Sequence, residues 1–113
     1  MLTINKMRDW GADVDEGMGR CMNNENFYLT LTGKAIQDPA YEGLKEAVEA
    51  GDLEKGFEFA HALKGVTANL ALTPIRKPVE KITELLRSRT ETDYAPLLEE
   101  ILQKRNELVG LCD

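Results

Sequence analysis

Apolar residues recur along most of this chain at spacings of three and four positions, which is the period of an amphipathic helix. In the second half of the chain, three such stripes are long enough to predict separate helices. Each helix would bury its apolar side against its neighbours and leave its polar side in water. The stripes consist of Phe59, Leu63, Val66 and Leu70, then Ile75, Val79, Ile82 and Leu86, and finally Leu97, Leu98, Ile101, Leu102, Leu108 and Val109.

Capping residues set the expected starts of these helices. Asp52 is a typical N-terminal cap, so the helix of the first stripe should run from there to about residue 69. Thr73-Pro74 predicts a capping threonine followed by proline at the first helical position. Thr92 or Asp93 is expected to cap the last helix.

The segment at 26–50 also has helical spacing, but Pro39 interrupts it. Proline lacks an N–H and disfavours helix at the residue before it. The segment is therefore either one long kinked helix or two helices joined at Asp38-Pro39. Gly51 is a typical stop signal at its end.

Residues 1–25 are the least regular part of the chain, with Asp13 as a candidate cap for a short helix through Met18 to Met22. No alternating run of β-branched residues predicts a strand. Amphipathic helices joined by short links pack as antiparallel neighbours. We therefore expect one domain over residues 1–113. It should be all-α, an antiparallel up-down-up-down four-helix bundle at 26–111 with a short helical N-terminal extension at 1–25 that packs on it.

Composition narrows the range of partners. The 113 residues are 42% hydrophobic and 30% charged, and 14 basic against 20 acidic residues give a net charge of −6. Because Lys and Arg form no concentrated run, nucleic acid and anionic membrane are not expected as partners. No apolar run approaches the roughly 18 residues of a membrane span, and no secretory signal is evident, so a cytoplasmic location is expected. Cys21 and Cys112 have no motif spacing and are interpreted as reduced thiols.

The chain has one histidine, His61, within the first of the three predicted helices. At about 100° per residue it falls roughly opposite the apolar stripe and should be exposed. The face around it is unusual for a solvated helix surface, because it contains a phenylalanine and a mid-helix glycine, which costs about 1 kcal/mol relative to alanine. This face collects Glu54, Phe57, His61, Lys64, Gly65 and Ala68.

Lys64 lies three residues after His61, so the two side chains share one surface neighbourhood. An ammonium there supplies positive charge for a phosphoryl group on the imidazole, and histidine is able to form such covalent intermediates. Without a side chain at Gly65, another protein's backbone is able to come close to the imidazole. Glu54 and Glu58 are candidate ion-pair partners of Lys64. Together these residues suggest phosphoryl exchange with a protein partner.

A family resemblance adds to this interpretation. The run AHALKG at 60–65, followed by ANL at 68–70, is similar to the signature of histidine-containing phosphotransfer (HPt) domains, the carriers of multistep two-component phosphorelays. The segments VDEGM at 14–18, RC at 20–21 and FY at 27–28 resemble the N-terminal region of that family. Val66 and Ala71 depart from its pattern, which often has a small hydroxyl residue and a glycine at these positions.

The resemblance implies that His61 accepts the phosphoryl group, Lys64 stabilises its charge, and Gly65 gives a receiver domain access. The expected docking face consists of Gly65, Phe57, Ala68, Glu54 and Glu58. The expected partners are response-regulator receiver domains and a hybrid histidine kinase, and the chain itself is expected to be a monomer. No cofactor is expected on this chain, since Mg²⁺ would be held by the receiver. The absence of a glycine-rich nucleotide loop argues against ATP-dependent kinase activity, which leaves a phosphoryl carrier.

Other interpretations of the same residues stay open. A helical adaptor would dock receiver or kinase domains through this face without carrying phosphate. A hydrolase would use His61 as general base, although Glu58 is the only weak candidate for an orienting carboxylate. Phe57 fits the edge of the core as well as it fits an exposed position, and Gly65 is also compatible with close helix packing. One histidine and two distant cysteines offer no ligand spacing for a metal.

Overall fold

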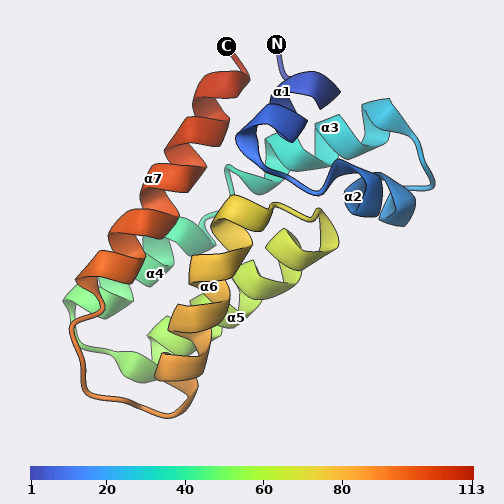
Figure 1. Ribbon diagram of the computed structural model, residues 1–113. Coiled ribbons are helices and arrows are strands. Elements are labelled where there is room, and N and C mark those ends of the chain that lie inside the picture. Colours follow the sequence, from blue (N-terminus) through green and yellow to red (C-terminus); the bar gives the residue numbers. More distant parts are fainter.

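The computed structural model describes residues 1–113, which form seven helices and no strand (Figure 1). The expectation of an all-helical chain is therefore confirmed. The helices are α1 Ile4–Trp10, α2 Val14–Arg20, α3 Glu25–Ala35, α4 Ala40–Glu49, α5 Leu53–Asn69, α6 Thr73–Arg87 and α7 Ala95–Leu111.

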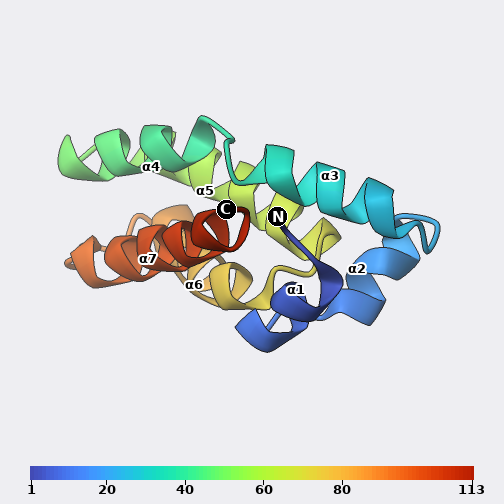
Figure 2. The same ribbon diagram turned by 90° about the horizontal axis from the view of Figure 1, so that it is seen from above.

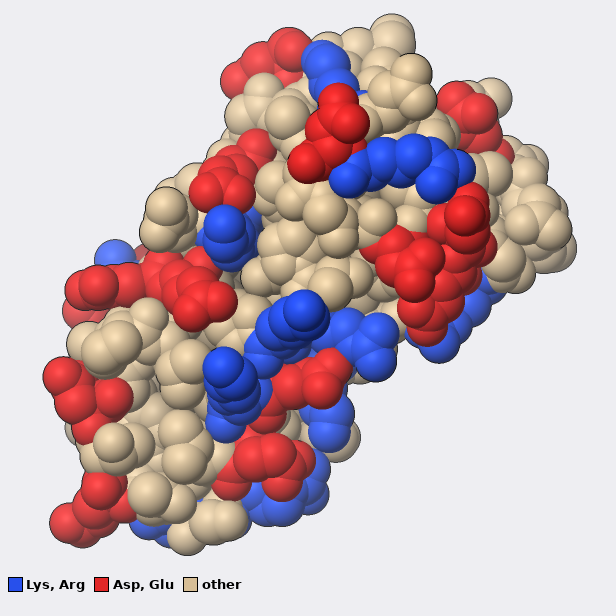
Figure 3. Space-filling model, viewed as in Figure 1, with Lys and Arg blue, Asp and Glu red and all other residues tan.

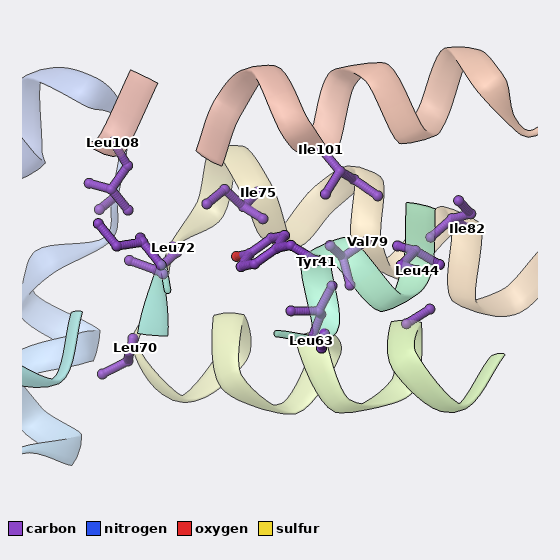
Figure 4. Close-up of a cluster of buried hydrophobic side chains, with 14 of the residues drawn as sticks. Tyr41, Leu44, Leu63, Leu70, Leu72, Ile75, Val79, Ile82, Ile101 and Leu108 are labelled. Carbon is purple, nitrogen blue, oxygen red and sulfur yellow. The ribbon is translucent and has the colours of Figure 1, made fainter. Parts of the chain in front are cut away.

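The four helices α4 to α7 surround the main core. α5 packs against both α4 and α6, α7 packs against α6, and α4 and α7 also touch. Figure 4 shows that all four helices contribute fully buried aliphatic side chains, among them Leu44, Leu63, Val79, Ile82 and Ile101. Complete burial of a side chain of this size stabilises the fold by about 1.5–3 kcal/mol. Most positions of the apolar stripes predicted from the sequence thus hold these helices together, but Val109 of the last stripe is exposed.

The segment at 26–50 forms two helices, which decides between the two alternatives. α3 ends at Ala35 and α4 begins at Ala40, with Pro39 as its N-terminal flanking residue. The Asp38 carboxylate accepts a hydrogen bond from the Ala40 N–H at 2.8 Å, which satisfies one of the free donors of the new helix. Seen from above, α3 and α4 follow one another along the same side of the molecule (Figure 2).

Two of the predicted caps are confirmed. Asp13 accepts from the Glu16 N–H at 3.3 Å at the start of α2, and Asp52 accepts from the Lys55 N–H at 3.0 Å at the start of α5. Gly51 follows α4 with φ +72°, the left-handed conformation that glycine adopts readily. Both aspartates therefore start their helices as predicted.

The structure moves the cap positions of the last two helices one residue away from Thr73 and Asp93. Leu72 occupies the cap position of α6, so Thr73 lies in the first turn, and its hydroxyl donates to the Ala71 carbonyl at 3.4 Å. Tyr94 occupies the cap position of α7, but the Asp93 carboxylate still accepts a hydrogen bond from the Ala95 N–H at 3.0 Å, so this predicted residue does satisfy a donor of the helix. Leu72 and Tyr94 are both buried, so apolar contacts also hold the start of each helix against the core.

Ala71, in the turn between α5 and α6, has φ +53°. This is the left-handed region, in which a residue with a Cβ is strained by about 1–2 kcal/mol. The conformation accounts for the glycine that the resembling family often carries at this position. Ala71 is fully buried and its carbonyl accepts from the Asp13 N–H at 3.0 Å, contacts that hold the strained residue in place.

The N-terminal region contains two short helices instead of the one expected. α1 is capped by Thr3 and packs on the end of α7, where Trp10 Nε1 donates to Glu107 Oε1 at 3.2 Å. α2 contacts α1 and α3. Its Gly17 lies so close to Tyr28 that an added Cβ would stand 2.5 Å from the ring atom Cε1. The region is closely packed against the remaining helices.

The two cysteines are unpaired, with Cys21 buried and Cys112 half-buried. None of the helices has the length and apolar character that would be needed to cross a membrane. On the face shown in Figure 3, groups of Lys and Arg side chains lie beside groups of Asp and Glu side chains.

Candidate functional site

The middle of α5 carries the candidate site, and the buried side of this helix determines its orientation. Leu63 and Leu70 are buried as predicted, whereas Phe59 and Val66 of the same predicted stripe are only half-buried. The buried positions of α5 itself are Gly56, Ala60, Leu63 and Thr67.

Small residues account for this shift of the buried stripe. Gly56 brings α5 so near α6 that an added Cβ would lie 3.3 Å from Leu86 Cδ2, so small side chains face the core. His61 points away from this side and is exposed, as predicted.

The ring of Phe57, one helical turn before His61, lies against the imidazole. The two rings are stacked, with centroids 5.5 Å apart and an interplanar angle of 22°. Phe57 is half-buried at the edge of the core, and the Arg87 guanidinium carbon of α6 lies 4.9 Å from its ring centroid. Phe57 therefore combines the two positions that the sequence left open, the edge of the core and the exposed face, because it packs on the core and also contacts His61.

Lys64 is half-buried and does not pair with a glutamate of its own helix. Its Nζ lies 3.7 Å from Oε1 of Glu84, which comes from α6. The expectation that Glu54 or Glu58 would pair with it is wrong, because these residues lie ten and six positions away and only residues three or four apart are direct neighbours on a helix surface. Both of these glutamates are exposed.

Glu84 contacts a second cation as well. Its Oε2 lies 3.4 Å from Arg87 Nε, one turn later on α6. Two cations, Lys64 and Arg87, thus share one carboxylate beside the Phe57–His61 pair. The i,i+3 spacing of Glu84 and Arg87 was visible in the sequence, but no pattern within either helix shows that Glu84 faces Lys64.

Gly65 is exposed, and an added Cβ would meet no heavy atom within 4 Å. Close packing against another helix is therefore not the reason for this glycine. Ala68, one turn later, is half-buried, and its carbonyl accepts a hydrogen bond from Arg20 Nη1 of α2. No pattern in the sequence predicts this contact. The contact places α2 at the edge of the face that carries His61.

No cluster of three or more His, Cys, Asp or Glu side chains in the chain is arranged to hold a metal ion. A cavity of about 630 Å³ lies between α4, the start of α7 and the loop before α7, and His61 is not among its lining residues. The candidate site therefore lies on an open helix face. Such a face suits a reaction with a group presented by another protein better than the enclosure of a small molecule.

The fold and this face define a class, namely an all-helical domain that exposes a histidine flanked by lysine and glycine on its central helix. The family model of the Hpt domain matches residues 38–110, more than half of the chain, and the chain belongs to this family. Hpt domains act in phosphotransfer in two-component signalling and interact with receiver domains and kinases. The family resemblance seen in the sequence is therefore confirmed.

The match covers the site helix and leaves out residues 1–37, which include the N-terminal segments at 14–18, 20–21 and 27–28. Comparisons with curated proteins and with solved structures gave no match.

Proposed function

We propose that this protein carries a phosphoryl group on His61 and relays it between aspartates of receiver domains. The observation that carries the proposal is the exposed imidazole in the middle of α5 of an Hpt domain, next to open space above Gly65. A receiver must bring its aspartyl phosphate to within bonding distance of the ring, and an open face permits that approach.

The proposed reaction is a direct transfer. The unprotonated ring nitrogen of His61 attacks phosphorus in line, forming a P–N bond as the P–O bond to the aspartate breaks. The electron pair of that bond leaves with the aspartate, which becomes a free carboxylate. Mg²⁺ held by the receiver and the Lys64 ammonium offset the charge of the transferring group. Transfer to a second receiver is the same step in reverse.

The docking face of the proposal is the exposed side of α5. Gly65 permits close approach, Phe57 and Ala68 supply apolar contact, and Glu54 and Glu58 lie at the rim. We infer an up-down-up-down arrangement of α4 to α7 beneath this face, a monomeric carrier, a cytoplasmic location, and no cofactor or ATP-dependent kinase activity on the chain itself.

The test is transfer from a phosphorylated receiver in the presence of Mg²⁺. The chain should gain an acid-labile, base-stable label, and His61→Gln should gain none. Equal labelling of the His61→Gln variant would overturn the proposal.

Binding of the receiver distinguishes a carrier from a helical adaptor. A carrier with the His61→Gln change still binds the receiver but blocks signalling output, whereas an adaptor with the same change retains both. Phe57→Asp should weaken receiver binding in either case, and it serves as the control for the docking face.

A further inference from the structure

Glu84 lies where it competes with a phosphoryl group for Lys64. We propose that this carboxylate withholds the Lys64 ammonium from His61 in the unphosphorylated protein and releases it when His61 is phosphorylated. The inference rests on the proposed function, because it concerns how readily the same histidine is loaded.

The contact between Lys64 and Glu84 suits such an exchange. The two atoms are 3.7 Å apart, and the side chains are 37% and 59% exposed. An ion pair this open contributes little stability and is easily broken. Lys64 also lies three residues after His61, within reach of a group on the imidazole. A phosphoryl group carries more negative charge than a carboxylate and attracts the ammonium more strongly.

Arg87 makes the release of Lys64 easier. Glu84 Oε2 lies 3.4 Å from Arg87 Nε, so the carboxylate keeps one cation when the other leaves. Arg87 is held in place by its contact with the ring of Phe57, 4.9 Å from the guanidinium carbon to the centroid. The cluster therefore has two arrangements. In one, Glu84 pairs with both cations, and in the other Glu84 pairs with Arg87 while Lys64 pairs with the phosphoryl group.

Removing the charge of Glu84 should therefore favour phosphorylation. In Glu84→Gln the ammonium is no longer shared, and the negative charge that repels an incoming phosphoryl group is gone. An exposed pair of this kind corresponds to a change of about two- to fivefold in an equilibrium or a rate.

Glu80 provides a matched control on the same helix. It pairs with Arg76, at 2.6 Å between Oε1 and Nε, and forms no ion pair with Lys64. Glu80→Gln removes the same charge one turn away, so it reports the effect of net charge alone. Thermal unfolding of both variants, compared with the unchanged protein, checks that the fold is kept.

The experiment uses phosphoramidate as a small donor, whose P–N bond breaks with loss of ammonia as the bond to His61 forms. Phosphorus NMR follows the rate of loading and the lifetime of phosphohistidine. Glu84→Gln should load about two- to fivefold faster than both the unchanged protein and Glu80→Gln. In a Lys64→Gln background, the effect of Glu84→Gln should largely disappear, because the ammonium for which it competes is missing.

The outcomes separate the two proposals. If neither phosphoramidate nor a phosphorylated receiver with Mg²⁺ labels His61 of the unchanged protein, the proposed function fails and this inference fails with it. If His61 is phosphorylated but Glu84→Gln loads no faster than Glu80→Gln, only the inference is overturned. A Glu84 effect that persists without Lys64 also contradicts it, since the charge would then act through another group.

Discussion

At the residue scale, most of what the sequence indicates about the site comes from residues that are near one another in the chain. His61, Lys64 and Gly65 lie close together in the sequence, and helical spacing alone brings them to one face. Glu84 is different, because only the packing of α6 on α5 brings it to Lys64. The sequence therefore predicts which residues of α5 share a face, but it does not predict that Lys64 pairs with a glutamate of α6.

Because no atom packs on Gly65, substitutions at this position affect folding and receiver docking separately. Gly65→Ala should stabilise the protein by up to about 1 kcal/mol, because glycine is a poor helix former and the new methyl meets no atom. Gly65→Trp should leave thermal unfolding nearly unchanged but slow transfer from a phosphorylated receiver strongly. Loss of stability in Gly65→Ala would show that this position is packed after all.

Two buried tyrosines differ in their hydrogen bonding. The Tyr28 hydroxyl donates to the Leu70 carbonyl at 2.9 Å, whereas the Tyr41 hydroxyl is buried without a partner. Tyr28→Phe should cost about 0.5–1.5 kcal/mol, and Tyr41→Phe should cost nothing or stabilise, because it removes an unsatisfied polar atom. Urea unfolding of both variants measures this difference, and equal losses would contradict the assignment of partners.

At the scale of elements, local signals predict some helix starts, whereas others depend on packing within the folded protein. Asp13 and Asp52 start helices as expected, because a capping side chain acts on its own backbone neighbours. The cap residues of α6 and α7, Leu72 and Tyr94, are buried, and burial depends on the whole core rather than on a local pattern. The short helix α1 packs on α7, and its local signals, Thr3 at the start and Gly11 at the end, were present in the sequence but were not recognised.

Two glycines of α2 differ in how closely other residues pack against them, so substitutions there measure the effect of packing. A Cβ at Gly17 would lie 2.5 Å from Tyr28 Cε1 and 2.7 Å from the Leu70 carbonyl oxygen, whereas one at Gly19 would meet nothing within 4 Å. Gly17→Ala should therefore destabilise the protein by about 1–3 kcal/mol. Gly19→Ala should stabilise it by up to about 1 kcal/mol. Urea unfolding followed by circular dichroism compares them, and similar values would mean that α2 does not pack closely on Tyr28.

At the scale of the whole molecule, the burial of two tyrosines makes the free energy of unfolding depend on pH in the alkaline range. Burial raises the pKa of Tyr28 and of Tyr41 to about 12 in the folded protein, from an ordinary value of 10.0. The unfolded chain therefore loses these protons first as the pH rises. The stabilising effect is fully present below pH 10 and is lost between about pH 10 and 12.

This linkage predicts a fall in stability of about 1.4 kcal/mol per pH unit for each tyrosine within that window. Tyr41→Phe should reduce the slope, because only Tyr28 of the two then titrates. Free energies of unfolding measured from pH 8 to 11.5 give both slopes. A stability that is flat across this range would contradict the burial of the two hydroxyls.

The location of the transferred phosphate decides whether His61 carries it. The protein is mixed with a phosphorylated receiver domain and Mg²⁺, digested at neutral to alkaline pH, and mapped by mass spectrometry. We expect phosphate on the peptide that contains His61 and none on any peptide of the His61→Gln variant. Phosphate on another residue, or an unmodified His61 peptide beside a receiver that has lost its phosphate, would contradict this expectation.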